Sequence, residues 1–218
     1  AMRIIAGFDV PQNAGVERAV KVVAREGCFF NAKFPAPSGG RASVQVRIFD
    51  AVNGAMSKAV PEKVRGAFTH WCNPNIGSCH RSKDRWVMYD LMFGGYGGRA
   101  GHDGEEGVAP VMNCANIPVE VHETNNPILI HRLEYIPDTG GAGEFRGGCG
   151  IRKDVELRDA AVVTLLSDRH VFPPYGLQGG KPGALARTIL IRNGVEQELG
   201  SKEVKELEPG DILSFRLA

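Results

Sequence analysis

The chain has 218 residues and a nearly balanced charge, with 26 lysines and arginines against 25 aspartates and glutamates. This balance excludes the strongly basic surface by which proteins bind nucleic acid or anionic membranes. The longest apolar run, Ala160 to Leu166, is far shorter than the ~20 residues that cross a bilayer, and the N-terminus lacks the layout of a signal peptide. The composition therefore predicts a soluble protein of one large or two small domains.

Cysteine usage and the two ends of the chain give two further expectations. The five cysteines are odd in number and irregularly spaced, which is typical of reduced thiols in a cytoplasmic protein rather than of a disulfide framework. Ala1 precedes Met2 like the remnant of an expression vector, and the chain stops within an apolar run that ends at Leu217 and Ala218. We therefore expect a cytoplasmic location and a fragment of a longer polypeptide.

The first third of the chain predicts one helix. Between Ala42 and Val60, apolar residues recur at helical spacing over the second half of the segment, and Pro61 ends it. The apolar runs 19–24 and 28–30 predict a strand and its continuation, with a short helix from Gly15 as the alternative.

Strand-like runs fill most of the remaining chain. The segments of strand length are Trp86 to Phe93, Ile128 to Tyr135, Val155 to Leu157, Ala161 to Leu166, Thr188 to Arg192, Glu196 to Leu199 and Ile212 to Leu217. Turn signals stand at Asn193-Gly194, which is typical of a β-hairpin, and at Glu208 to Asp211. The pattern predicts an α+β fold with a β-rich C-terminal half, sandwich or barrel-like, and a soft division into a mixed α/β portion (1–108) and a β-rich portion (109–218).

Two glycine motifs resemble nucleotide-binding loops but lack the context of such loops. Gly95 to Ala100 fits G-x-G-x-x-A after a predicted strand, yet the glycine-rich residues 101–107 cannot form the helix whose N-terminus would hold a pyrophosphate. Gly179 to Gly183 contains Gly-Lys followed by proline, without the serine or threonine that would hold Mg²⁺. The sequence therefore predicts no nucleotide site in this chain.

Two groups of polar residues are better explained as loop residues than as sites. His70, Cys72, Cys79 and His80 lie close together, but structural zinc sites pair ligands roughly two to four residues apart, and adjacent ligands suit tetrahedral coordination poorly. The segment 167–170, Ser-Asp-Arg-His, has the residue types of a catalytic triad, but neighbours in sequence cannot align as nucleophile, base and orienting group. We expect no metal site here.

The segment 113–123, Asn-Cys-Ala-Asn-Ile-Pro-Val-Glu-Val-His-Glu, is a stronger candidate for chemistry. If it is extended, Glu120 and His122 share one face as a carboxylate and an imidazole suited to acid–base work. The alternative is a half-buried strand with a polar outer face. The amide side chains of Asn113 and Asn116 just before the pair, and the glycine segment after it, favour the first interpretation.

The glycine segment runs from Asp138 to Gly150, and six of its thirteen residues are glycine. Each glycine costs about 0.5–1 kcal/mol of backbone entropy relative to alanine, so the segment requires a physical reason. Three reasons stay open: turns that need positive φ, backbone packing that tolerates no Cβ, and exposed amides arranged around an anionic group.

Five motifs of this sequence together resemble the hydantoinase B/oxoprolinase family, and the resemblance spans nearly the whole chain. The motifs are Asn13 to Gly15, Asn31 to Ala36, Asn113 to Glu120, Asp138 to Gly150 and Ser167 to Gly183. The family includes the B-type subunits of ATP-dependent N-methylhydantoinases and oxoprolinases, and the related large subunits of acetone and acetophenone carboxylases.

The resemblance implies a partner and a division of the chemistry. ATP with Mg²⁺ is held by an A-type subunit, which phosphorylates the carbonyl or enol oxygen of a small-molecule substrate. The B-type subunit then completes the ring-opening hydrolysis of a cyclic amide or, in the carboxylases, a carboxylation. Family members are longer, and the upstream stretch in which the carboxylases hold a divalent metal has no counterpart here. This chain is therefore expected to carry no cofactor itself and to work only within a hetero-oligomer.

Mapped onto this sequence, the resemblance implies a substrate site around the glycine segment, although threonine stands at 139 where the family usually has serine. The groups expected to bind the activated oxygen are Asn113, Asn116, Gly140, Gly141, Gly143, Gly147 and Gly148. Arg146 is expected to be the charge partner and Asp138 to fix the loop. Glu120 or Glu123, with His122 beside them, is expected to act as the general base or to orient it. A purely structural glycine loop, a fragment of a carboxylase-type subunit and a non-catalytic binding module stay open as alternatives.

Overall fold

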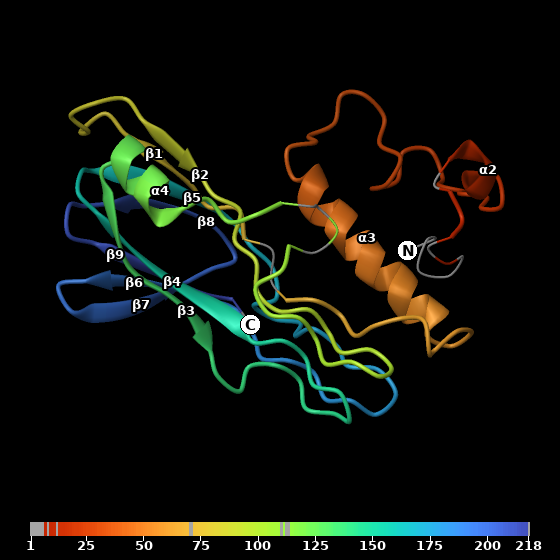
Figure 1. Ribbon diagram of the computed structural model, residues 1–218. Coiled ribbons are helices and arrows are strands. Elements are labelled where there is room, and N and C mark those ends of the chain that lie inside the picture. The colour runs from red at the N-terminus through yellow and green to blue at the C-terminus, as the bar shows by residue number, and fades with distance from the viewer. Residues whose placement is uncertain are drawn as a thin grey trace. The chain divides into compact units, whose positions relative to one another are not determined.

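The computed structural model describes residues 7, 9–11, 13–69, 72–109, 111 and 114–217. The chain divides into two compact units, Ala1–Val64 and Arg65–Ala218, and the division expected near residue 108 falls inside the second unit. Figure 1 labels the helices and strands. Within the described ranges, every helix is too short or too polar to cross a membrane.

Within its described residues, the first unit contains two helices, α2 (Ala14–Glu17) and α3 (Arg41–Met56). Helix α3 confirms the predicted helix, although it ends before the turn at 57–59 rather than at Pro61. Helix α2 confirms the short-helix alternative, and its first turn is capped by Asn13, whose side chain accepts a hydrogen bond from the Gly15 N–H at 2.9 Å.

The strand predicted over 19–24 and 28–30 is wrong. Residues 20–25 form neither helix nor strand, and Cys28 makes only an isolated bridge with Asn31. Val22 and Val23 are exposed. Strand propensity reflects packing against neighbouring strands, so β-branched residues without a pairing partner do not form a strand here.

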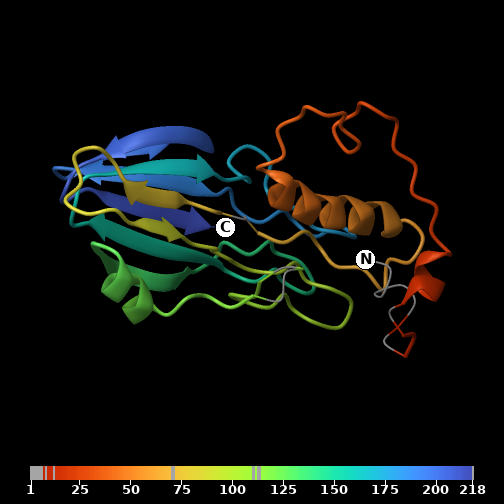
Figure 2. The same cartoon turned by 90° about the horizontal axis from the view of Figure 1, so that it is seen from above.

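The second unit is a sandwich of two antiparallel sheets, which confirms the predicted β-rich α+β fold (Figures 1 and 2). One sheet has the order β2-β1-β5-β8 and the other β3-β4-β9-β6-β7. The strands are β1 (Asn75–Ser78), β2 (Val87–Tyr89), β3 (Ile128–Ile136), β4 (Gly150–Leu157), β5 (Ala161–Leu166), β6 (Arg187–Arg192), β7 (Val195–Leu199), β8 (Lys202–Leu207) and β9 (Ile212–Leu217).

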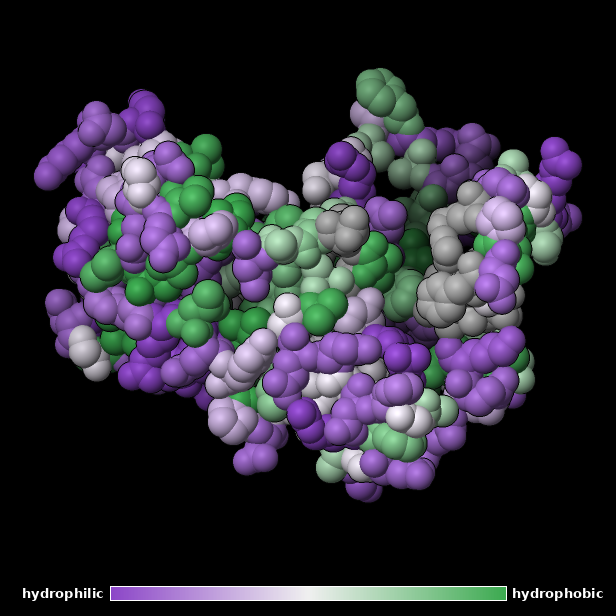
Figure 3. All heavy atoms as spheres, in the orientation of Figure 1, coloured by the Kyte–Doolittle hydropathy of each residue, from purple (hydrophilic) through white to green (hydrophobic). Residues whose placement is uncertain are grey.

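The core lies between the two sheets. Ile76 and Val163 from one sheet and Val155, Leu213 and Phe215 from the other belong to one buried apolar cluster. Alternate residues of β5 are buried, as expected of a strand that turns one face to the core. Figure 3 shows hydrophilic and hydrophobic residues intermixed on the outer surface of the sandwich.

Turn chemistry at one hairpin agrees with the sequence, whereas two strands, β1 and β8, escape prediction. Asn193 and Gly194 join β6 to β7 with φ of 52° and 77°, the left-handed conformations that a tight hairpin turn requires. Strand β8 is absent from the predicted set because its sequence, Lys-Glu-Val-Lys-Glu-Leu, is mostly charged. It is an edge strand, where charged side chains are favoured because they discourage pairing with other chains.

Candidate functional site

Three glycine-rich loops lie side by side at one end of the sandwich in Figures 1 and 2: residues 94–107, 140–148 and 176–183. Their backbones are in direct contact. A Cβ atom on Gly95 would lie 2.2 Å from the carbonyl oxygen of Gly148, and one on Gly141 would lie 2.2 Å from the carbonyl oxygen of Lys181. Neither glycine has a positive φ. The observation therefore supports the packing explanation at these positions, because only a residue without a Cβ fits.

Several amides of the glycine segment already donate to the protein itself. The Gly147 N–H donates to the carbonyl oxygen of Gly141 at 2.9 Å, and the Gly148 N–H donates to that of Tyr96 at 2.8 Å. The Gly150 N–H donates to Oγ1 of Thr139 at 2.7 Å. Thr139 thus closes the loop with its hydroxyl, which also donates to the Ile136 carbonyl oxygen at 2.7 Å. These donors are not directed at open space where a substrate oxygen would sit.

Three of the other predicted groups of the loop, Asp138, Gly143 and Arg146, are exposed. Asp138 is exposed and has a φ of 59°, a turn conformation. Nη2 of Arg146 lies 2.8 Å from Oε1 of Glu106, and Nε lies 3.8 Å from Oδ2 of Asp103. The pair with Glu106 raises the pKa of Arg146 above its usual range. The guanidinium is therefore shared between carboxylates of the protein. Gly143 is exposed and Gly140 packs against Gly147.

The segment after Asn116 is a helix, α4 (Val119–Asn125), so the predicted extended segment is wrong. Pro118 precedes the helix, and successive residues turn by ~100° around its axis. Glu120 and His122 therefore point to nearly opposite sides instead of sharing a face. Glu120 is exposed, whereas His122 is buried. The other predicted amide, Asn113, lies outside the described residues.

Glu123, the alternative carboxylate, is engaged in the fold. Its Oε1 accepts a hydrogen bond from the backbone N–H of Ile130 at 2.7 Å. Ile130 stands beside the register shift in edge strand β3, so the carboxylate satisfies a backbone donor where the strand pairing is irregular.

His122 belongs to a buried cluster with Asp90 and Lys153. Nζ of Lys153 lies 2.5 Å from Oδ2 of Asp90, and Nε2 of His122 lies 3.4 Å from Oδ1 of the same carboxylate. Each of the three side chains is at most 6% exposed. Because an isolated buried charge is strongly unfavourable, Asp90 and Lys153 depend on each other for compensation.

Lys153 and His122 have hydrogen-bonding groups that Asp90 does not fully satisfy. A lysine ammonium has three donors, and Lys153 directs one of them at Asp90. The distance of 3.4 Å from His122 to Asp90 is at the limit of a hydrogen bond, and Nε2 has no better-aligned acceptor in the part of the chain that the structure describes. Burial lowers the pKa of His122, and the positive charge of Lys153 lowers it further against the opposing effect of Asp90.

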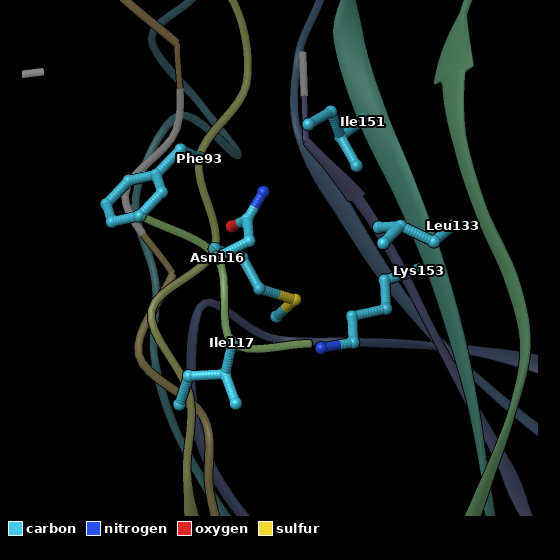
Figure 4. Close-up of a pocket in the computed structure, with 7 residues that line it drawn as sticks. Phe93, Asn116, Ile117, Leu133, Ile151 and Lys153 are labelled. Carbon is cyan, nitrogen blue, oxygen red and sulfur yellow. The ribbon is translucent and has the colours of Figure 1, made fainter. Parts of the chain in front are cut away.

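Lys153 of this cluster also lines a small cleft (Figure 4). Its enclosed space is about 10 Å³, room for roughly one water molecule. The lining residues are Met92, Phe93, Asn116, Ile117, Leu133, Ile151 and Lys153. Figure 4 shows Lys153 reaching from β4 across the cleft toward the Asn116–Ile117 segment, with Ile151 and Leu133 on its own side. The site thus combines apolar walls with one amide and one ammonium group.

The sandwich is open at this position. By register, Leu133 and Tyr135 of edge strand β3 stand opposite Lys153 and Ile151 on the inner face. They are nevertheless 47% and 52% exposed. Inner-face apolar side chains that remain half exposed mark the place where a ligand can enter between the sheets.

From the sequence, His70, Cys72, Cys79 and His80 are interpreted as loop residues rather than metal ligands. The structure tests this interpretation only in part, because His70 lies outside the described residues. Cys72 is buried, and its Sγ lies 3.1 Å from Oγ of Ser167. Burial raises the pKa of the Cys72 thiol to about 12. Among the residues that are described, no three histidine, cysteine, aspartate or glutamate side chains form a cation site.

Comparison with known proteins decides the family. The family model described as Hydantoinase B/oxoprolinase matches residues 1–218. The chain belongs to the hydantoinase B/oxoprolinase family. It is 33% identical, over 99% of its length, to an uncharacterised protein of Methanocaldococcus jannaschii, of which it covers 38%. It is 31% identical, over 87% of its length, to the B-type subunit of a putative D-/L-hydantoinase from Pseudomonas sp. strain NS671, of which it covers 32%.

A solved structure supports the fold of this hydantoinase B-like chain. The crystal structure of ATP-dependent caprolactamase from Pseudomonas jessenii superposes with a TM-score of 0.81 at 24% identity, over 99% of this chain and 40% of that one. The chain therefore spans well under half the length of the relatives that it matches.

Two residues of the candidate site, Asp90 and Lys153, are missing from the sequence prediction. Asp90 is the only charged residue in the apolar run 86–93, Trp-Val-Met-Tyr-Asp-Leu-Met-Phe. Lys153 alternates with Ile151 and Val155 along β4, at a position that faces the core. A charged residue at a core position is the available signal, because it requires a compensating partner.

Proposed function

We propose that this chain is part of a B-type subunit that opens the ring of a small cyclic amide after an A-type subunit has activated the substrate with ATP. Family membership supports this proposal, as do two relatives whose names refer to cyclic amides, the putative D-/L-hydantoinase and the ATP-dependent caprolactamase. The observation that carries it is the cleft that holds Asn116 and Lys153 between apolar walls.

The cleft has the chemical character that a small neutral amide requires. An asparagine side chain offers one acceptor and two donors, so Asn116 can accept the N–H and donate to the C=O of an amide held cis within a ring. Met92, Ile117, Leu133 and Ile151 offer an apolar surface to the ring carbons. The enclosed part of the cleft is about 10 Å³, so it admits one polar group of the substrate rather than the whole ring.

The ATP and Mg²⁺ required by this function are assigned to the A-type partner. In the described residues the one carboxylate beside the cleft, Asp90, is already paired with Lys153, and no side-chain set there fits a divalent cation. Overall the reaction consumes two waters: one is added across the C–N bond, and the other is used as ATP becomes ADP and phosphate. We also propose a cytoplasmic location, because all five cysteines are free thiols.

The acid–base role is proposed for Glu120. Its carboxylate is exposed on α4, four residues after Asn116 in the chain, whereas Glu123 is bound to the Ile130 N–H. A carboxylate that is free to accept a proton is the better general base for an attacking water.

Reconstitution tests the proposal. The chain, within the polypeptide that its gene encodes, is combined with an A-type subunit, and ring opening of hydantoin, 5-oxoproline and caprolactam is followed together with ADP release. The expected result is ring opening that requires ATP and both subunits. ADP release that instead requires bicarbonate and a ketone would identify a carboxylase, and ring opening without the B-type polypeptide would contradict the proposal.

A further inference from the structure

We propose that the outer face of the sheet β2-β1-β5-β8 is an interaction surface, covered by an apolar layer from the part of the same B-type polypeptide that lies outside these 218 residues. This inference goes beyond the proposed function, because it concerns the assembly of the subunit and not the chemistry of the cleft. The observation that carries it is a set of apolar side chains on the side of this sheet that is turned away from the core.

Strand register defines the residues of this outer face. Residues that pair across the four strands stand side by side in two rows, Tyr89, Asn75, Thr164 and Val204 in one and Val87, Gly77, Val162 and Glu206 in the other. The residues that alternate with them along the strands, Met88, Ile76 and Val163, belong to the buried core. Because successive side chains of a strand point to opposite faces, both rows point away from the core.

The outer face is apolar and uncovered. Val87, Tyr89 and Val204 are 70%, 51% and 66% exposed, and Val162 and Leu166 of the central strand β5 are partly exposed. An antiparallel sheet with one face in water normally alternates apolar and polar residues, whereas a run such as the Ala-Val-Val-Thr-Leu-Leu of β5 is typical of a strand buried on both faces. Contiguous exposed apolar side chains mark interaction sites.

The other sheet of the same sandwich has an outer face suited to water. Arg152 and Asp154 alternate with core-facing residues of β4 and form an ion pair at 2.7 Å. Arg187 of β6 and Glu198 of β7 form another at 2.7 Å. The two outer faces therefore differ in kind, and the apolar one is not a general property of this sandwich.

The polar groups at the rim of the apolar face already have partners within the chain. Arg81 pairs with Glu206 at 3.1 Å and with Glu208 at 2.6 Å, and Nζ of Lys202 donates to the carbonyl oxygen of Ser167. The charged edge strand β8 also discourages the addition of a further strand. The matching partner is therefore an apolar helix or sheet surface that packs on the face.

The length of the relatives indicates where this layer comes from. The chain covers 38% of the Methanocaldococcus jannaschii protein and 40% of the caprolactamase chain, so more than half of such a polypeptide is available to pack on these residues. A layer in the same polypeptide also has an effective concentration in the millimolar range, which a separate subunit does not reach by diffusion. Folding domains bury an apolar sheet face in this way, by adding a layer.

Cysteine accessibility tests the proposal in the whole polypeptide that the gene encodes, without an A-type subunit. Val87→Cys and Val204→Cys are treated singly with a maleimide, and peptide mass spectrometry separates each new thiol from the native cysteines. Val195→Cys is the matched control, because Val195 is 69% exposed at the start of β7 in the other sheet. The two thiols on the apolar face should react at least about tenfold more slowly than the control, and all three should react equally in urea, where the local opening that limits labelling is complete.

Hydroxyl-radical footprinting of Tyr89 in the unchanged polypeptide repeats the test without a substitution, and Tyr89 should be protected. Equal labelling at all three positions, with Tyr89 oxidised, overturns the proposal. Protection that appears only after an A-type subunit is added, or that is lost on dilution, would assign the cover to that subunit or to a second copy and overturns the proposal as well. None of these measurements depends on ring opening, so their outcome is independent of the proposed function.

Discussion

Gly95 and Gly148 lie backbone against backbone, so that a Cβ atom on Gly95 would be 2.2 Å from the carbonyl oxygen of Gly148 and 2.4 Å from its carbonyl carbon. The two residues come from different glycine-rich loops, and this contact holds the loops together without side chains. The entropic cost of ordering so many glycines is therefore offset by packing and by hydrogen bonds between the loops.

Replacement of Gly95 by alanine is expected to destabilise the chain by about 3 kcal/mol, because the new methyl group must displace a neighbouring backbone. The measurement is urea unfolding followed by circular dichroism. Gly143→Ala is the matched control, since the nearest atom to its Cβ would lie at 3.4 Å and its φ is not positive. Equal losses of stability in the two variants would contradict the packing explanation.

The sequence predicts those parts of the fold that depend on local patterns. Strand β5 alternates buried and half-buried residues, and Asn193-Gly194 has the chemistry of its turn, so both follow from a short window. Helix α4 does not, because Val-Glu-Val-His alternates as a strand would, while the observed helix begins after Pro118 and buries His122. Tertiary contacts override the pattern there.

The candidate site is harder to predict from the sequence than the fold is. The resemblance of the motifs points to the region of Asn116, but the pairing of Lys153 with Asp90 depends on how β4 and the end of β2 come together in space. The glycine segment illustrates the same limit. Composition leaves three reasons for it open, and the 2.2 Å approaches support one of them at Gly95 and Gly141.

The Asp90–Lys153 pair should show strong coupling in its effect on stability. Asp90→Asn or Lys153→Met alone leaves one buried charge unpaired, and each is expected to cost about 3–5 kcal/mol. The double variant is expected to cost about 1 kcal/mol or less, because neutral side chains need no compensation. Urea unfolding of the four proteins measures the coupling, and additive losses would show that the two charges do not depend on each other.

His122 should make stability depend on pH. Its pKa in the folded chain lies below the 6.5 of an ordinary histidine, chiefly because it is buried. The unfolded chain therefore binds more protons as the pH falls below ~6.5, so this contribution to stability is fully present above that pH and declines toward the folded-state pKa. The expected loss is up to about 1.4 kcal/mol per pH unit in that window.

The comparison for this pH effect is His122→Gln, in which Asp90 and Lys153 still face the position. Unfolding free energies of both proteins at several pH values between neutrality and pH ~5 isolate the contribution of the imidazole. The variant should show a shallower decline than the unchanged chain. Parallel curves would mean that His122 does not titrate differently in the folded and unfolded states.

Arg146→Ala tests the predicted role of Arg146 as charge partner of an activated oxygen. The guanidinium is half exposed and already faces Glu106 and Asp103, so we expect hydantoin affinity and the turnover of the reconstituted assembly to stay unchanged. Glu106→Gln, which frees the guanidinium from its shortest ion pair, is the matched variant. A large fall in kcat in the first variant together with a rise in the second would instead support the anion-binding role.

Glu120 and Glu123 stand on the same short helix but should respond differently to the same substitution. Glu123 accepts from the Ile130 N–H at 2.7 Å, and a glutamine retains an oxygen that can accept, so Glu123→Gln should leave both stability and kcat nearly unchanged. Glu123→Ala should destabilise the chain by about 1–2 kcal/mol, because the backbone donor loses its partner.

Glu120→Gln should leave the unfolding midpoint unchanged, since the side chain is exposed, but lower kcat by about a hundredfold or more if it is the general base. Unfolding curves and ring-opening rates of the three variants in the reconstituted assembly separate the two roles. A fall in kcat for Glu123→Gln with normal stability would move the base from Glu120 to Glu123, and the hydrogen bond to Ile130 would then have to open during turnover.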